Sequence, residues 1–420
     1  MTIDPDLVRQ ARRKAGLSLA QVAGSDLTRQ AVHLIETGKV RPSMRSLQII
    51  ARRLGVSALS FQMPVDSGTE VPHRRAAELE RLCDRQRFDE VVELAEQLLA
   101  QDNSAYLAAF AHLYRGRALA HLGRPDDALP HLRQARRVFD SEDDPWSAAE
   151  AREWEATALY LKEDARAVAI GEDALARYRA LEPRRPEVEA RMVEHLATFL
   201  VQRTDYVRAE QCYQQALQIA GPVLDLTRIA RIYHGLGRCA YSLGQARRAS
   251  ELVSRAVALY AVENDLRPSS AQIALPRAEN DLGVIYLREG QLERAEEFFW
   301  SALHRMEEAG AERLQGQVLL SLAEVRQGQD RLQDAFELIE RALELARRLE
   351  QPGVVATCNR QLAELHELRG EHVLADERFT QAMAILDAAG QSGRRSEYLA
   401  AYQRMLDARA GAAPLERSAG

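Results

Sequence analysis

The sequence predicts an all-α protein in which a small five-helix domain precedes a long α-solenoid of helical hairpins. The first indication is composition: 46% of the residues are hydrophobic but only 6% are aromatic, and alanine, leucine, arginine and glutamate dominate. This mixture favours helices over strands. The second indication is a pattern of small residues that recurs roughly every forty residues. The third is the length of 420 residues, which exceeds what one hydrophobic core ordinarily serves.

Charge is divided unevenly along the chain. Residues 1–63 contain ten Lys and Arg against four Asp and Glu, a net charge of +6. The remainder contains 46 against 58, a net charge of −12. A small basic head on a large acidic body indicates that the two parts bind different partners, and the head is suited to a polyanion.

The head, residues 1–63, contains start and stop signals for five short helices. The predicted ranges are 5–15, 19–23, 28–37, 43–54 and a last short turn that contains Leu59 and Phe61. The residues placed as N-caps are Ser18, Thr28 and Ser43, and those placed as stops are Gly16, Gly38 and Gly55. Two short helices joined by a tight link, inside a basic unit of this size, are typical of the helix-turn-helix arrangement.

The segments VRQARRKAGLSLAQVA, TRQAVHLIETGKVRPS and LQIIARRLGVS follow the order and spacing of the Xre, or lambda-repressor-like, helix-turn-helix family. The resemblance covers residues 6–61. It implies that the third helix enters the major groove with Arg29, Gln30 and His33 toward the bases. Arginine reads guanine and glutamine reads adenine through paired hydrogen bonds, so these residue types suit that role. The residues expected at the helix start or on the DNA backbone are Thr28, Lys39, Arg41 and Ser43.

Three further expectations concern the head. Glu36 is acidic on a DNA-facing helix, and in the family a glutamate there pairs with an arginine of the first helix, which here is Arg12. Leu19 stands where the family usually has a phosphate-contacting glutamine, so one backbone anchor is missing. Arg52 and Arg53 are expected to form a solvated face.

The segment QMPVDSGTEVPHRR, residues 62–75, contains two prolines and a glycine without a helical period, and it predicts a flexible hinge. The predicted domain boundaries are listed here together: head 1–63, linker 64–75, repeats 76–389, capping helix 390–410 and a disordered tail 411–420.

The body repeats one pattern, a helix with a small residue after a leucine, then a turn, then a helix with alanines seven apart. The clearest copy is ENDLGVIYLREGQLERAEEFFWSAL, residues 279–303. Small residues allow the two helices of a hairpin to approach closely, and each hairpin needs neighbours to bury its apolar face. The pattern resembles tetratricopeptide repeats. The resemblance implies a right-handed superhelical tetratricopeptide-like α-solenoid of about eight hairpins.

The first helix of each hairpin is expected to line the inner surface of the solenoid. The predicted ligand-binding residues are Arg191, Arg231, His234, Arg238, Tyr241, Arg277 and Asn280. Three of the arginines share one repeat position and suit the carboxylates of a peptide, while Asn280 offers a paired donor and acceptor to a peptide backbone. The alternative is that these arginines pair with glutamates of the solenoid itself.

An Xre-type head joined to tetratricopeptide-like repeats resembles the RRNPP group of peptide-sensing regulators of Gram-positive bacteria. The resemblance implies a transcription regulator, active in quorum sensing, that binds double-stranded DNA, takes a short signalling peptide in its repeats and forms a homodimer. The alternative is an interaction scaffold whose repeats recruit a protein partner without a small ligand. A phosphatase resembling the Rap proteins is a third reading, against which the head argues, so the chain is not expected to be an enzyme.

Motifs of the common catalytic and metal sites do not occur: there is no HExxH, no P-loop and no GxSxG. We expect no cofactor and no metal, including at the two histidines of HELRGEH, residues 366–372. The four cysteines form no CxxC and are expected to be buried, reduced thiols. No run of eighteen apolar residues occurs, so we expect a soluble, cytoplasmic protein that does not bind a membrane.

Overall fold

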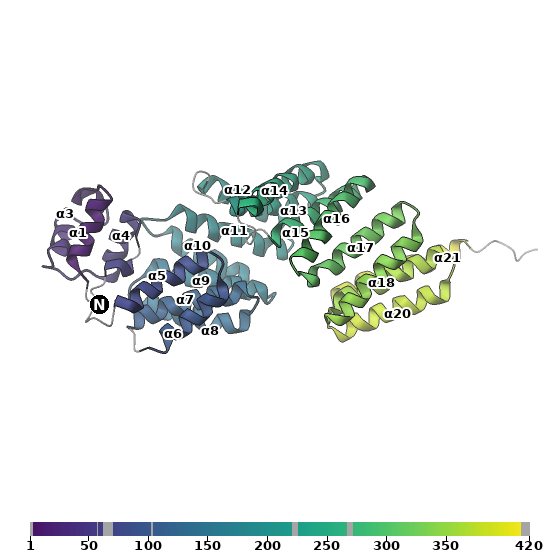
Figure 1. The fold of residues 1–420 in the computed structure, drawn as a ribbon, viewed down its shortest axis with the longest axis horizontal. Helices are drawn as coiled ribbons and strands as arrows, with labels where there is room; N and C mark the ends of the chain where they lie inside the picture. Colours follow the sequence, from purple (N-terminus) through teal and green to yellow (C-terminus); the bar gives the residue numbers. More distant parts are fainter. Residues whose placement is uncertain are drawn as a thin grey trace, which may run out of the picture. The chain divides into compact units, whose positions relative to one another are not determined.

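The molecule is helical, and no β-strand occurs within the described residues (Figure 1). The computed structural model describes residues 3–56, 58–61, 70–101, 104–220, 226–266 and 272–412. The chain divides into two compact units, Met1–Cys239 and Ala240–Gly420. The all-α prediction is therefore confirmed.

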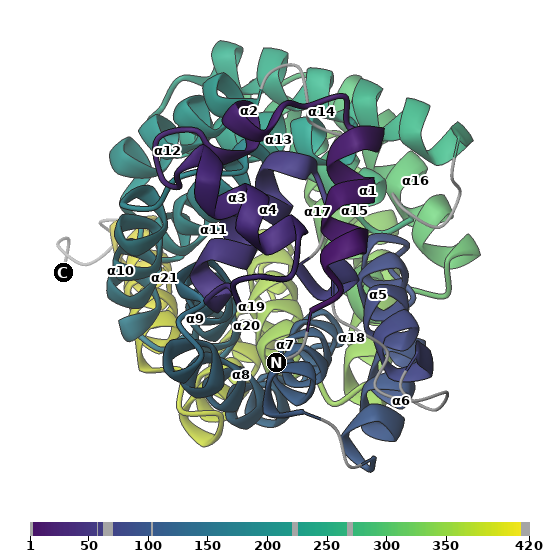
Figure 2. The ribbon, with the colours of Figure 1, turned by 90° about the vertical axis from the view of Figure 1, so that its left-hand side faces the viewer.

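The first unit begins with a cluster of short helices that corresponds to the head (Figure 2). It consists of α1 (Pro5–Lys14), α2 (Leu19–Ala23), α3 (Arg29–Glu36), α4 (Met44–Leu54) and the 3₁₀ turn η1 (Ala58–Phe61). Its fully or almost fully buried apolar side chains include Val8, Val22, Val32, Ile35, Leu47, Ile50 and Phe61. Each of these helices lies inside the range that the sequence predicts.

Side-chain caps explain why the head helices begin where they do. Ser18 and Gln21 form a reciprocal capping box, in which the Ser18 hydroxyl accepts from the Gln21 N–H at 3.2 Å and the Gln21 side chain accepts from the Ser18 N–H at 2.8 Å. Thr28 accepts from the N–H of Ala31 at 3.0 Å and thereby starts α3. Gly55 ends α4 at φ +68°, a left-handed conformation that glycine adopts without steric cost.

Eight consecutive pairs of helices and one final helix follow the head within the described residues. The first four pairs are α5 (Glu70–Asp84) and α6 (Phe88–Leu99), α7 (Ala105–His121) and α8 (Pro125–Ser141), α9 (Pro145–Leu161) and α10 (Arg166–Arg179), α11 (Pro186–Gln202) and α12 (Tyr206–Ala220). The remaining helices are α13 (Leu226–Ser242), α14 (Ala246–Leu266), α15 (Ala274–Arg288), α16 (Leu292–Glu308), α17 (Glu312–Gly328), α18 (Leu332–Arg348), α19 (Pro352–Leu368), α20 (His372–Ala388) and α21 (Ser392–Ala412). This is the hairpin series that the sequence predicts.

The predicted linker needs a correction. Helix α5 already begins at Glu70, so residues 70–75 of the predicted 64–75 linker are helical, and the remainder, 64–69, lies outside the described residues. Pro72 is compatible with helix because it lies in the first turn, where a backbone N–H has no acceptor within the helix. The loop interpretation followed the proline and overlooked this exception.

The small residues of the repeat pattern sit where helices approach closely. A Cβ atom added to Gly283 of α15 would lie 2.6 Å from a ring carbon of Phe299 on α16, and one added to Gly116 of α7 would lie 2.5 Å from Leu132 on α8. Real Cβ atoms do not approach so closely, so glycine is required for each hairpin to close. Phe299 and Leu132 are themselves fully buried.

The last helix, α21, covers the end of the second unit. Tyr398 packs with Ala356, Ala382 and Leu386, and its hydroxyl lies 3.0 Å from the Thr357 hydroxyl. The predicted capping helix, 390–410, thus corresponds to Ser392–Ala412, and residues 413–420 of the predicted tail lie outside the described residues. In the described part of the chain, none of the helices combines the length and the apolar character needed to cross a membrane.

Candidate functional site

Helix α3 presents its polar side chains to solvent and its apolar side chains to the core of the head. Val32 and Ile35 are buried, and Arg29, Gln30 and His33 are exposed. Within the described residues, the side chains of Arg29 and Gln30 form no hydrogen bond or ion pair. The other residues predicted to face DNA, namely Thr28, Lys39, Arg41 and Ser43, are exposed as well. The helix start and its first turn are therefore accessible to a polyanion.

A buried ion pair holds the C-terminal end of α3. Arg12 of α1 donates from Nε to Glu36 Oε1 at 2.6 Å and from Nη2 to Glu36 Oε2 at 2.8 Å. Glu36 is only 3% exposed. The hydrogen bond with Glu36 raises the pKa of Arg12, although burial opposes this shift. This is the pairing that the resemblance implies, and its two parallel bonds fix the orientation of both side chains.

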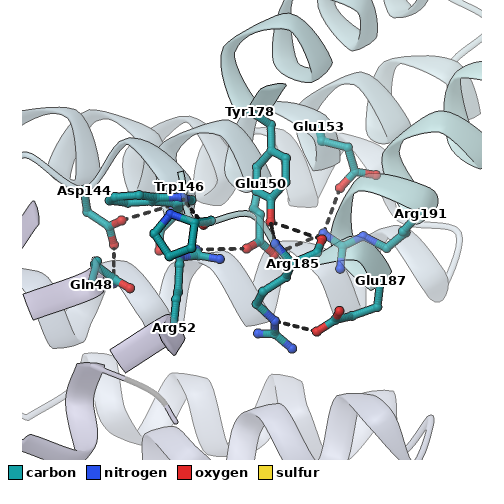
Figure 3. A network of polar contacts seen from close by, with 12 residues as sticks. Gln48, Arg52, Asp144, Trp146, Glu150, Glu153, Tyr178, Arg185, Glu187 and Arg191 are labelled. Carbon is teal, nitrogen blue, oxygen red and sulfur yellow. Dashed lines mark hydrogen bonds and ion pairs between the residues drawn. The ribbon is translucent and has the colours of Figure 1, made fainter. Parts of the chain in front are cut away.

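Helix α4 is tied to the repeats by a polar cluster that the sequence did not reveal (Figure 3). Gln48, 5% exposed, donates from Nε2 to Tyr106 Oη and to Asp144 Oδ2, both at 2.8 Å, and Tyr106 donates to the same Asp144 oxygen at 2.8 Å. Asp144 is fully buried and caps α9 through Ser147. Burial raises the pKa of Asp144, and the hydrogen bonds from Ser147 and Tyr106 oppose that rise.

Arg52, one α-helical turn after Gln48, extends the contact. Its guanidinium carbon lies 5.2 Å from the centroid of the Trp146 ring, and its Nη2 lies 3.7 Å from Glu150 Oε1. Glu150 Oε2 accepts in turn from Arg191 Nη2 at 3.0 Å. Arg191 Nη2 also lies 3.4 Å from Glu153 Oε2. A chain of alternating charge thus leads from the head through α9 to α11 (Figure 3).

The expectation of a solvated face at Arg52 and Arg53 is wrong. The side chain of Arg52 is only 8% exposed because it lies between Trp146 and Glu150. Arg53 donates to the carbonyl oxygen of Val22 at 2.8 Å and pairs with Asp26, so it binds the end of α2. Both side chains have structural partners that are distant in sequence, and no local pattern indicates them.

Helix α4 nevertheless carries a signal for this contact. Leu47, Ile49 and Ile50 are all buried, although adjacent helical residues point in different directions. A helix with apolar residues on more than one side is covered on more than one side. Ile49 beside Ile50, with Gln48 before them, therefore indicates a second packing surface.

Two of the predicted ligand-binding arginines of the first unit, Arg191 and Arg231, pair with glutamates of the preceding hairpin. Arg191 binds Glu150 and Glu153, and Arg231 Nε lies 2.8 Å from Glu194 Oε1. Burial alone would lower the pKa of Arg191, but Glu153 and Glu150 outweigh it and raise that pKa. The repeat that places the arginines at equivalent positions also places a glutamate opposite each of them on the preceding hairpin. For Arg191 and Arg231 the structure therefore agrees with the alternative, in which these arginines pair with glutamates of the solenoid itself.

The other predicted ligand-binding residues have different surroundings. Arg238 is exposed and His234 is half-buried, both in the first unit. In the second unit Tyr241 packs partly against the core, and Arg277 is exposed. Asn280 donates to Asp281 Oδ1 at 3.5 Å, while its own Oδ1 is buried without a hydrogen-bond partner among the described residues. An unmatched acceptor of this kind is suited to a backbone N–H of a ligand.

Trp154 of α9 is surrounded by cationic and imidazole side chains. The guanidinium carbons of Arg117 and Arg191 lie 5.0 and 5.8 Å from its ring centroid, and the rings of His121 and His195 lie 5.1 and 5.3 Å away. Burial, and to a smaller extent the positive charge of Arg117, lower the pKa of His121 to about 3. His121 is therefore neutral at physiological pH.

Acid is expected to destabilise the first unit through His121. The unfolded chain takes up a proton near pH 6.5 and the folded chain only near pH 3, so unfolding becomes more favourable as pH falls through that interval. At pH 5 the protonation of His121 in the unfolded chain lowers the free energy of unfolding by about 2 kcal/mol. Urea unfolding at pH 7.5 and pH 5 should show a smaller loss for His121→Phe, whose ring can keep the stacking on Phe88.

His33, which is exposed on α3 of the same unit, supplies the matched control for that measurement. His33→Phe should lose as much unfolding free energy between pH 7.5 and pH 5 as the unsubstituted protein does. Equal pH dependence in all three proteins would contradict the assignment to His121.

The histidines of residues 366–372 and the four cysteines have the following surroundings. No group of three or more His, Cys, Asp or Glu side chains that could hold a metal ion occurs there. His366 pairs with Glu371 at 2.5 Å and His372 with Glu367 at 3.1 Å. Of the free cysteines, Cys83, Cys239 and Cys358 are buried and Cys212 is half-buried. Burial raises the pKa of the Cys239 thiol to about 11 and that of Cys358 to about 12.

Comparison with protein families and solved structures agrees with this architecture. A helix-turn-helix family matches residues 8–61, and a tetratricopeptide repeat family matches residues 188–261 and 314–388. Neither is a family of enzymes. No curated protein sequence matches the chain.

Among solved structures, the apo form of the quorum sensor NprR from B. thuringiensis is 14% identical, with a TM-score of 0.62 over 91% of this chain and 100% of that chain. The apo form of RapI is 15% identical, with a TM-score of 0.53 over 67% of this chain and 99% of that chain. A Rap protein complexed with competence and sporulation factor is 18% identical, with a TM-score of 0.50 over 88% of this chain and 99% of that chain. At these identities the similarity is one of fold.

Proposed function

Because the chain is a helix-turn-helix protein with C-terminal tetratricopeptide repeats and resembles the RRNPP regulators in fold, we propose that it is a cytoplasmic, sequence-specific transcription regulator. In this proposal α3 reads DNA, the repeats bind a short signalling peptide, and the protein acts as a homodimer. Arg29, Gln30 and His33 face the bases, and Lys39 and Arg41 bind phosphates.

The observation that carries this proposal is that α3 and α4 have different surroundings. The polar side chains of α3 are exposed, while α4 is held on the repeats by Gln48 and Arg52. The head is thus attached to the repeats through a surface other than its DNA-facing one. A ligand that changes the repeats can change the position of the head without competing for α3.

Selection of DNA sites from a random duplex pool tests the DNA-binding part. We expect the full-length protein to select paired half-sites separated by about one helical turn, roughly 10 bp, or a multiple of it. Arg29→Ala or Gln30→Ala should relax the preference at one base position per half-site, because a bidentate contact contributes about 1–3 kcal/mol of discrimination. Unpaired sites would contradict the dimer, and unchanged preference in both variants would contradict direct readout.

Lys39→Ala is the matched control for base readout. A lysine on phosphate contributes affinity without sequence information, so its loss should weaken binding to all sequences alike and reduce the slope of log K against log salt by about one. The selected sequence should stay the same. A change of preference in Lys39→Ala would contradict its assignment to the DNA backbone.

A further inference from the structure

We infer that Arg117 and Trp154 form the subsite that takes a carboxylate of the ligand bound by the repeats. This inference rests on the proposed function and names residues outside the set predicted from sequence. Arg117 belongs to α7 and Trp154 to α9, which are the first helices of two successive hairpins and contact each other. Helix α9 also contacts α11, so the three first helices form one continuous surface of the first unit.

Arg117 differs from its neighbours because, among the described residues, no carboxylate lies within ion-pair distance of it, although Glu80 and Glu153 are near enough to interact with its charge. Arg115 lies 3.7 Å from Glu96, and Arg191 binds two glutamates, but Arg117 forms no ion pair or hydrogen bond within the described residues. Its guanidinium carbon instead lies 5.0 Å from the ring centroids of both Tyr114 and Trp154. These rings fix a planar, unpaired cation that is only half-buried.

Trp154 supplies a second, independent indication. The residue is 2% exposed, and its indole Nε1 is buried without an acceptor, as is Arg117 Nε beside it. A buried donor without an acceptor costs about 1–3 kcal/mol, so such groups ordinarily have a partner. His121 and His195 flank the same ring, and neither forms a hydrogen bond with Nε1.

The surrounding charges disfavour a doubly charged anion more strongly than a singly charged one. Glu80 and Glu153 lie near enough to interact with Arg117, and Arg191 provides a second positive charge at the Trp154 ring. A phosphate with nearly two negative charges would be repelled by the two glutamates. A carboxylate carries one charge, matches the fork of the guanidinium and accepts from an indole N–H. The source of the carboxylate is the C-terminus of a peptide or an acidic side chain.

Affinity selection of hexapeptide pools on the full-length protein tests this site, with retained peptides measured by mass spectrometry. One pool has a free C-terminus and no Asp or Glu, a second is amidated and contains Asp and Glu, and a third is amidated without Asp or Glu. We expect the protein to retain members of the first or second pool, which also identifies the source of the carboxylate, and not of the third. Arg117→Gln should lower retention about ten- to hundredfold, as expected for loss of a charge-assisted hydrogen bond.

Arg137→Gln is the matched control, because Arg137 is exposed on α8 of the same hairpin and has no ion pair among the described residues. Arg137→Gln should retain peptides as the unsubstituted protein does. Arg117→Lys keeps the charge without the fork and should retain an intermediate amount, and the melting temperatures of all variants should agree. Equal retention by Arg117→Gln and Arg137→Gln, or strong retention of the third pool, overturns the subsite but leaves the proposed function intact. Retention of no peptide by the unsubstituted protein overturns the peptide-binding part of the proposed function itself.

Discussion

Replacing Arg191 by methionine is expected to lower the free energy of unfolding of the first unit by about 3–5 kcal/mol, because it leaves buried carboxylates without their cation. Glu150 and Glu153 both bind this guanidinium, and Glu153 is only 1% exposed. Burial alone would raise the pKa of Glu153, but His195 and Arg191 outweigh it and lower that pKa to about 2. Urea unfolding at neutral pH measures the loss.

The same substitution should loosen the head. Glu150 is shared between Arg191 and Arg52, so the change disturbs the ionic contact of α4 with the repeats. Hydrogen exchange of the α4 amides should accelerate in Arg191→Met. Arg203→Met, at the exposed end of the same helix, is the control and should change neither quantity. An Arg191→Met protein as stable as Arg203→Met would refute the structural role of this ion-pair chain.

The second large effect is expected at Arg12. Arg12→Met leaves Glu36 buried and unpaired at the base of α3, which costs about 3–5 kcal/mol. The head contains few buried residues, so this loss should unfold it and abolish DNA binding while the repeats remain folded. Electrophoretic mobility shift with a selected DNA site and circular dichroism of the helices measure the two consequences.

Two variants make the result at Arg12 decisive. Arg13→Met removes an exposed cation from the same helix and should bind DNA nearly as well as the unsubstituted protein. The double variant Arg12→Met/Glu36→Leu removes both charges and should recover much of the stability, because an apolar pair replaces a buried ion pair at little cost. DNA binding by Arg12→Met equal to that of Arg13→Met would show that the pair does not hold α3.

The helices of the head were predictable because their limits depend on neighbouring residues. Ser18, Thr28 and Ser43 satisfy backbone N–H groups three residues further on, and Gly55 ends its helix through its own backbone conformation. Residues 70–75 were wrongly predicted to be linker because the effect of proline depends on its position in a helix. Proline breaks a helix in the interior and is tolerated in the first turn, and only the position of the helix start decides between these two effects.

The hairpins of the body were predictable for a related reason. A small residue that must face a large one across a hairpin, such as Gly283 against Phe299, recurs at a fixed period, so the pattern itself contains the packing partner. The residues on the first helices were predictable as a set. Their charge partners were not, because a partner one hairpin away is no nearer in sequence than many other carboxylates.

The sequence by itself determined the all-helical class, the limits of the head helices, the succession of head and repeats, and which side chains of α3 remain exposed. These properties follow from caps, helical periodicity and a repeat, all of which act over a few residues or one period. Only the tertiary structure decided that Gln48 meets Asp144, that Arg52 meets Trp146 and Glu150, and that Arg191 is paired while Arg117 is not. A buried charge is stabilised by whichever opposite charge the fold brings within a few ångströms, and that distance is a property of packing between helices rather than of any one of them.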